Sequence, residues 1–353
     1  MRDLTLLPKA HLHLHFTGSM RVPTVLEMAD RHGLHLPEVF RSQWPPELTE
    51  AADARGWFRF QRLYDAARAC VRSEADMRRI VREAAEDDHA EGSRWLEIQV
   101  DPTSYGPFVG GITPALEIVL DEARAVSAEA AAGGPVSPVA VVVAASRMRH
   151  PLDARALARL AAHHAGDGPG SVVGFGLSND ERRGVTPEFA GAFRIAHAAG
   201  LALVPHAGEL LGPEAVVETL DALHPDRLGH GVRSVEDPAV LDRVVEQQVA
   251  LEVCPGSNVA LGVYDDAPQV PLRRLVDAGA TIALGADDPL LFGSRLVDQY
   301  RTARDVHGLP DETVAELARG SIRASRAPRT LREQMLGEVD AWLAGPLARA
   351  GRA

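Results

Sequence analysis

Hydrophobic and polar positions along the chain follow two alternating patterns from one end to the other. Short, mostly apolar runs typical of buried parallel strands alternate with longer stretches in which apolar residues recur every three to four positions, as in amphipathic helices. No repeat, low-complexity tract or long linker interrupts the alternation, so residues 1–353 are expected to form one domain. The pattern predicts eight units in which a strand is followed by helix.

The predicted strands are short, and the predicted helices between them are longer. Strands are expected within Pro8–Gly18 and over Trp95–Val100, Val136–Ala144, Ser171–Leu177, Leu201–Pro205, Arg227–Gly229, Ala250–Val253 and Thr281–Gly285. Helices are expected over Val22–Arg31, Trp57–Val71, Ala75–Glu91, Ala115–Ala130, Leu152–His164, Pro187–Ala198, Pro213–Leu220, Asp237–Gln247, Leu272–Ala278 and most of Ser294–Leu343. Eight such units predict an α/β fold, a TIM (β/α)8 barrel with extra N-terminal and C-terminal helices.

The first strand alternates histidine with leucine, which places His11, His13 and His15 on one face. Imidazoles on a buried strand are explained either by metal ligation or by hydrogen bonding in the core. A pair of histidines two residues apart can direct two ring nitrogens toward one ion. His11 lies deeper in a barrel that fills with side chains, so we expect it to stay out of a metal site.

Active sites of TIM barrels lie at the C-terminal ends of the strands. The residues suited to chemistry fall at the predicted ends of four strands: His13, His15, His206, Glu209, His230, Asp287 and Asp288. A single histidine at a strand end is more often a core residue than a ligand. Four strand ends that meet at one mouth favour a functional site.

Three imidazoles and one carboxylate make up the candidate ligand set: His13, His15, His206 and Asp287. This set suits zinc, although iron, cobalt or manganese could also occupy it. Glu209 could donate or accept a proton beside a water at the ion, and its alternative role is an exposed acid at a helix start. His230 is a candidate base or electrostatic partner, and its alternative role is structural.

Composition and charge restrict the class of protein. A hydrophobic content of 46% without an apolar run of membrane-spanning length is typical of a globular protein outside the membrane. The net charge of -12 argues against nucleic acids and anionic membranes as partners. Two cysteines do not make a disulfide framework, and the N-terminal residues lack a signal-peptide layout, so the cytoplasm is the expected compartment. Composition leaves open whether the chain forms a homo-oligomer.

Several short motifs, one per strand, together resemble the adenosine deaminase family of the amidohydrolase superfamily. They are Pro8–His15, His206–Glu209, Gly229–Gly231, Glu252–Pro255 with Ser257 and Asn258, and Asp287–Pro289. The resemblance covers nearly the whole chain and implies that the candidate ligand set holds one zinc ion. It also implies that Glu209 protonates purine N1, that His230 assists the attacking water together with Asp287, and that Asp288 hydrogen-bonds to N7.

The number of metal ions has a separate indicator. Many members of the superfamily carry two metals bridged by a modified lysine on the fourth strand. The predicted fourth strand has no lysine, and Lys9 is the only lysine in the chain. One zinc ion per chain is therefore expected.

The resemblance implies hydrolysis of adenosine, or a related 6-aminopurine nucleoside, by water to the 6-oxo product and ammonia. Thr17 stands where adenosine deaminases usually have aspartate and adenine deaminases usually have glutamate. Free adenine, aminodeoxyfutalosine and an N6-substituted adenine nucleotide therefore remain alternative substrates. A third alternative is a barrel that binds a nucleoside without turnover. The presence of Glu209 and of all four candidate metal ligands argues against it.

Contacts to the substrate are implied for His15, Thr17, Phe60, Tyr64, Asn179 and Asp288. Asn179 replaces a glycine whose backbone usually contacts purine N3. Phe60 and Tyr64, four residues apart on a predicted helix, match apolar positions that cover the pocket in relatives, and core packing is their alternative role. Gln99 and Asp101 depart from the arginine-containing motif usual on the second strand.

Overall fold

The computed structural model describes residues 1–42, 44–48 and 54–345. Its centre is a parallel sheet of eight strands, each paired with the next in chain order. The strands are β1 (Lys9–His15), β2 (Ser93–Val100), β3 (Val139–Ser146), β4 (Val172–Ser178), β5 (Ala202–Ala207), β6 (Arg227–His230), β7 (Ala250–Val253) and β8 (Ile282–Leu284). The N–H of Asp287 donates to the carbonyl of His13, and the N–H of His15 donates to that of Asp287, both at 3.0 Å. These bonds join the two edges, so the predicted TIM barrel is confirmed.

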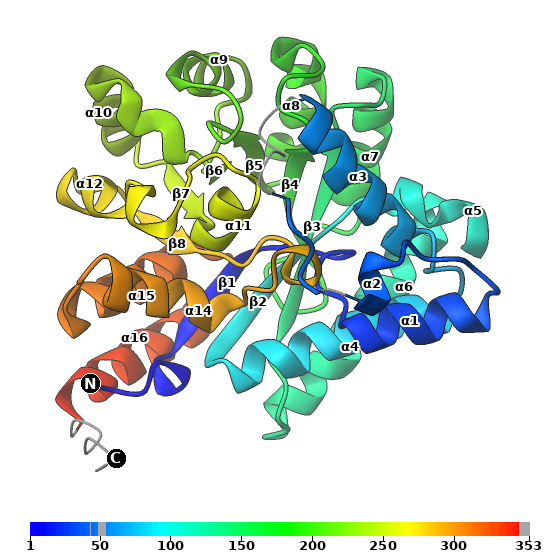
Figure 1. The fold of residues 1–353 in the computed structure, drawn as a ribbon, viewed down its shortest axis with the longest axis horizontal. Coiled ribbons are helices and arrows are strands. Elements are labelled where there is room, and N and C mark those ends of the chain that lie inside the picture. Colours follow the sequence, from blue (N-terminus) through cyan, green and yellow to red (C-terminus); the bar gives the residue numbers. More distant parts are fainter. Residues whose placement is uncertain (43, 49–53, 346–353) are drawn as a thin grey trace.

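Helices surround the strands on the outside, and the N-terminal segment lies beside the last helix (Figure 1). They are α1 (Val22–Arg31), α2 (Val39–Ser42), α3 (Ala54–Arg68), α4 (Glu74–Ala90), α5 (Gly106–Val109), α6 (Ile112–Ala131), α7 (Pro151–His163), α8 (Ala190–Ala198), α9 (Pro213–Leu223), α10 (Pro238–Glu246), α11 (Pro255–Ala260), α12 (Leu272–Asp277), α13 (Pro289–Phe292), α14 (Leu296–Arg301), α15 (Asp311–Ala324) and α16 (Arg329–Ala344). No helix in these described ranges is both long and apolar enough to cross a membrane.

Local sequence explains where these helices begin and what they cover. At the start of α4, for example, the Ser73 hydroxyl accepts a hydrogen bond from the N–H of Asp76 at 3.1 Å. The apolar stripe of α4 includes Met77, Ile80 and Val81, which are buried against the barrel. Such burial fixes the helices around the sheet.

The predicted elements are all present; α1 and β7 have the predicted ends, and the others are shifted. The third strand was expected over Val136–Ala144 but runs over Val139–Ser146, because Pro138 lacks the N–H that a strand interior needs. Four short helices were not predicted: α2, α5, α11 and α13. They contain four to six residues, too few to show a helical period.

A buried set of charged side chains fills the interior of the barrel below its mouth. The Arg227 guanidinium donates to Glu252 at 2.7 Å and to Glu97 at 2.5 Å. Glu97 also accepts from the indole N–H of Trp95 at 2.9 Å. All four residues are at most 1% exposed. The two carboxylates offset the cost of burying the guanidinium and raise the pKa of Arg227.

His11 belongs to the core, as the sequence led us to expect. Its Nδ1 lies 2.8 Å from a carboxylate oxygen of Asp88, and its Nε2 lies 3.0 Å from the N–H of Ala286. Nδ1 therefore carries the proton and donates to Asp88, while Nε2 accepts from the backbone. Neither nitrogen of His11 is left for a metal ion.

Candidate active site

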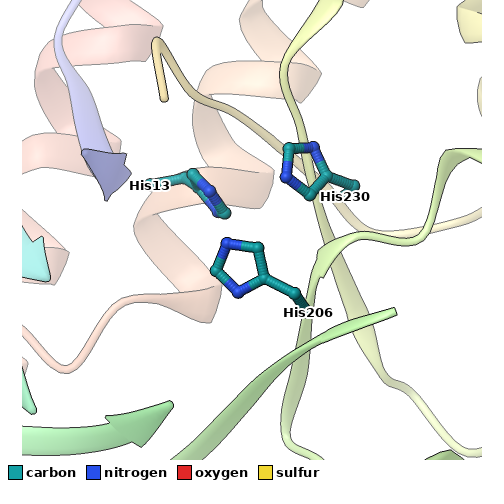
Figure 2. A group of neighbouring side chains, drawn as sticks. All are labelled: His13, His206 and His230. Carbon is teal, nitrogen blue, oxygen red and sulfur yellow. The ribbon is translucent and has the colours of Figure 1, made fainter. Parts of the chain in front are cut away.

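Histidines from three strands face one another at the barrel mouth. Figure 2 shows His13 on β1, His206 on β5 and His230 on β6 around a common centre. The ring centroid of His13 lies 4.8 Å from the centroid of His206, 4.8 Å from that of His230 and 5.1 Å from that of His15. The predicted strand ends therefore do meet.

The four predicted ligands approach one another through the atoms that bind metals. Asp287 Oδ1 lies 3.2 Å from His15 Nε2 and 3.5 Å from His13 Nε2, and His15 Nε2 lies 3.3 Å from His206 Nε2. The buried Nε2 of His13 forms no hydrogen bond in the described part of the chain. Three ring nitrogens and a carboxylate oxygen that converge this closely, one of them buried without a partner, fit a divalent cation.

Other residues lie near enough to form alternative ligand groups. Donor atoms of His13, His206 and His230 lie within 4.8 Å of one another, as do those of His230, Cys254 and Asp287. His230, however, directs Nε2 toward a carboxylate oxygen of Glu209 at 3.4 Å. His230 therefore lies beside Glu209, and the four predicted ligands form the candidate metal set.

Backbone strain occurs at two residues of the site. His230 has a φ of 65° and Asp287 a φ of 61°, values that non-glycine residues seldom adopt. Ser257 donates a hydrogen bond of 2.6 Å to the Asp287 carboxylate and helps to hold it. Burial raises the pKa of Asp287, but the close imidazoles of His13 and His15 outweigh burial and hold the pKa well below the usual range. Asp287 is therefore ionised.

Two close approaches at the mouth require glycine. A Cβ on Gly229 would lie 2.9 Å from His206 Nδ1 and 3.1 Å from His13 Cε1. A Cβ on Gly18 would lie 1.8 Å from a carboxylate oxygen of Asp288. Glycine at these positions allows the backbone to pass directly against the site.

Glu252 of β7 forms a hydrogen bond with the Nδ1 atom of His13, on the side of the ring away from the other ligands. Its carboxylate lies 2.8 Å from His13 Nδ1 and also accepts from Arg227, and Glu252 is completely buried. With the proton on Nδ1, the lone pair of His13 is on Nε2, which faces the other ligands. Glu252 therefore selects the tautomer that a metal site needs.

Glu252→Gln should weaken zinc binding about 10-fold to 100-fold, because such supporting hydrogen bonds orient the ligand and raise its basicity. Competition with a chromophoric chelator measures the affinity without reference to catalysis. The exposed Glu246, at the end of α10, offers Glu246→Gln as a matched control with unchanged affinity. Wild-type affinity in a folded Glu252→Gln protein would show that Glu252 does not position His13.

The loop that carries Glu209 is held by another carboxylate. Glu181 accepts hydrogen bonds from four successive backbone N–H groups at 2.6 to 3.1 Å: Gly208, Glu209, Leu210 and Leu211. Glu181 is itself 6% exposed. This arrangement fixes the backbone of Glu209 before any ligand binds.

Glu209 and its neighbours have shifted protonation equilibria. Burial, with the negative charges of Asp287 and Glu181, raises the pKa of Glu209 well above its usual value. Burial, with the neighbouring His13, lowers the pKa of His230 to about 3. Glu209 therefore keeps its proton to higher pH than an exposed glutamate does, and it lies beside an imidazole that is neutral at pH 7.

A cavity of about 90 Å³ opens beside the cluster. Its lining includes all the predicted substrate contacts: His15, Thr17, Phe60, Tyr64, Asn179 and Asp288. Asn179 has a φ of 79°, which explains why it can replace the glycine usual in relatives: asparagine tolerates this region better than most residues. The sequence did not point to Tyr105, which also lines the cavity.

Thr17 is already hydrogen-bonded within the protein. Its hydroxyl lies 2.6 Å from the phenol oxygen of Tyr105, and Thr17 is 1% exposed. Tyr105 packs edge-on against Phe16, with ring centroids 5.2 Å apart. Thr17 lines the cavity, but its hydroxyl is not a free charged acceptor.

An eight-stranded barrel with histidines and aspartates converging at its mouth defines an enzyme of the amidohydrolase class. The sequence model of the family described as "Adenosine deaminase" matches residues 8–342. The chain belongs to the adenosine deaminase family.

Relatives and solved structures agree with this assignment. The chain is 58% identical to a putative adenosine/adenine deaminase of Streptomyces virginiae, over 98% of this chain and 99% of the relative. The solved adenine deaminase of Arthrobacter aurescens is 30% identical, with a TM-score of 0.84 over 96% of this chain and 99% of that one. An amidohydrolase of Burkholderia ambifaria with bound zinc is 22% identical, with a TM-score of 0.83 over 97% and 93%, and shares the fold.

Proposed function

We propose that this protein is a zinc-dependent aminohydrolase that converts a 6-aminopurine, either adenosine or a related nucleoside or the free base, to its 6-oxo product and ammonia. The observation that carries the proposal is a buried Glu209 carboxyl group, with a raised pKa, in the same cavity as the convergent ligand set. A proton donor beside a metal site is what an attack of water on an amidine carbon requires.

The proposed zinc ligands are His13, His15, His206 and Asp287. Zinc bound there would lower the pKa of a water molecule toward neutrality. The Nζ of Lys9 donates to the carbonyls of Leu4 at 2.9 Å and Glu91 at 2.7 Å, so the chain's only lysine is engaged away from this set. A single ion per chain is therefore proposed.

The protein's own groups would move the protons. Asp287 and His230 would accept the proton of the attacking water and orient its oxygen toward C6. Glu209, whose pKa is raised by burial, would donate its proton to ring N1 as charge builds there. Burial, with the charge of Asp287, raises the pKa of Asp288 well above its usual value, so Asp288 would donate a hydrogen bond to N7. The 6-amino group would then take the proton held by Asp287 and His230 and leave as ammonia, and the new hydroxyl would return a proton to Glu209 to give the 6-oxo group.

Free adenine is a second candidate substrate beside adenosine. It is supported by the bond between Thr17 and Tyr105, which removes the hydroxyl that would meet a ribose 5′-hydroxyl. The Arthrobacter aurescens adenine deaminase among the similar structures also supports it. Aminodeoxyfutalosine and N6-substituted adenine nucleotides complete the set of candidates.

The decisive experiment follows the change in purine absorbance and the release of ammonia with zinc-loaded protein. The substrates are adenine, adenosine, 2′-deoxyadenosine, aminodeoxyfutalosine and N6-methyl-AMP. At least one should be turned over with kcat/KM on the order of 10⁴ M⁻¹s⁻¹ or more, the range of ordinary enzymes. Absence of turnover with the whole panel would contradict the proposed function and favour a binding protein.

A further inference from the structure

Gln99 of β2 occupies a position at the mouth of the barrel that the catalytic groups leave unused. On the same strand, Trp95 and Glu97 point into the barrel, where Glu97 accepts hydrogen bonds from both Trp95 and Arg227. The two-residue period of a strand directs Gln99 to the same side, and Gln99 lines the cavity. Its neighbour in register on β1 is His15.

The amide of Gln99 has no partner in the described part of the chain. Gln99 is 1% exposed, yet neither its Nε2 nor its Oε1 forms a hydrogen bond there. The polar groups directly beneath it, on Glu97 and Arg227, are all engaged. A buried amide without partners costs about 1–3 kcal/mol, so its retention at the cavity wall points to a ligand that completes it.

A side-chain amide presents one donor and one acceptor in a plane, and it pairs with a donor and an acceptor that lie side by side. A 6-aminopurine has three such edges. Two include the reacting 6-amino group, and in the proposed function their ring nitrogens, N1 and N7, face Glu209 and Asp288. The third is the N3 and N9–H edge, which only the free base has, because a nucleoside carries its sugar on N9.

The strand order places Gln99 opposite the reacting carbon. β2 lies four strands from β6 in the closed barrel, so Gln99 and His230 line opposite sides of the cavity at the mouth. With N1 toward Glu209 after β5 and N7 toward Asp288 after β8, the edge of the purine remote from C6 points to β2. That edge contains N3 and N9.

We infer that Gln99 is a specificity-determining residue whose amide accepts from N9–H and donates to N3 of a free 6-aminopurine base, in place of the backbone contact to N3 that the resemblance implies at Asn179. The inference rests on the proposed function and narrows it to the unsubstituted base. A substituent on N9 removes the donor and leaves the amide oxygen unpaired, and sites built around a hydrogen bond strongly reject analogues that lack it.

The test compares adenine with 9-methyladenine, in both turnover and calorimetric binding to the zinc-loaded protein. The wild type should prefer adenine at least about tenfold in kcat/KM. Gln99→Leu should weaken adenine binding and raise its KM by about 10-fold to 100-fold, while 9-methyladenine changes less than about threefold. Gln99→Met should behave alike, and the exposed Gln247 offers Gln247→Leu as a control with wild-type values.

The possible results distinguish a failure of the role of Gln99 from a failure of the proposed function. Equal losses for the two bases, an unchanged adenine Kd in Gln99→Leu or Gln99→Met, or a wild type that deaminates adenosine but not adenine would overturn the role of Gln99. The last of these would leave the proposed deamination intact. Adenine binding that depends on Gln99 without any turnover of the substrate panel would instead contradict the proposed function.

Discussion

Glu209→Gln should lower kcat by at least about a hundredfold while zinc content and KM stay within about threefold of wild type. Removal of a general acid typically costs two to four orders of magnitude in rate. Glutamine fills the same buried volume and can still hydrogen-bond, but it has no acidic proton for ring N1. Initial-rate absorbance assays with the best substrate of the panel measure kcat and KM.

A matched control is Glu214→Gln, because Glu214 lies five residues further on, in the first turn of α9, and is exposed. It should keep wild-type constants. Near-wild-type kcat in a zinc-loaded Glu209→Gln protein would assign the proton transfer to another group, and Asp288 would be the next candidate.

Arg227→Met should reduce the free energy of unfolding by about 3–5 kcal/mol, the usual cost of removing one partner from a buried ion pair. The substitution leaves Glu97 and Glu252 buried without the guanidinium that joins them. Urea unfolding followed by circular dichroism measures the loss.

The surface provides the control for Arg227. Arg243 pairs with Asp221 at 2.6 Å, where the side chains are 30% and 61% exposed. Arg243→Met should cost less than about 1 kcal/mol, because exposed pairs contribute little. Equal effects of the two substitutions would mean that the buried network contributes no more than a surface pair.

The order of strands and helices could be predicted because the two-residue period of a strand changes to the roughly 3.6-residue period of a helix at each boundary. The alternation of histidine and leucine in β1 gave the strand, its buried face and the direction of its imidazoles together. The short helices after strand ends, such as α11 and α13, have no periodic signal and follow from tertiary contacts. β3 begins only after Pro138, which has no N–H to donate to the sheet. The valine-rich run around it hid this start in the sequence.

The candidate site was predictable where residue type alone suggests chemistry, as for His13, His206 and Asp287. Supporting residues were not. Glu181 lies in a loop, and only the fold shows that its carboxylate meets four backbone N–H groups. Glu252 stood within a recognised motif, but its hydrogen bond to His13 joins positions 239 residues apart.

Thr17 illustrates the same limit for specificity. The sequence showed that a neutral hydroxyl replaces a carboxylate at this position, and hence that a charged contact to ribose is missing. It did not show that Tyr105, 88 residues away, takes up that hydroxyl. Pairings between distant loops depend on the closed barrel, so they become visible only in three dimensions.

One measurement tests the central claim most directly: zinc titration of metal-free protein, with bound metal and deamination of the best 6-aminopurine followed together. We expect chelation to abolish turnover, and activity to return in proportion to zinc until about one ion per chain is bound. Full turnover by metal-free protein, or activity that returns only after a second ion is tightly bound, would contradict a single-zinc aminohydrolase.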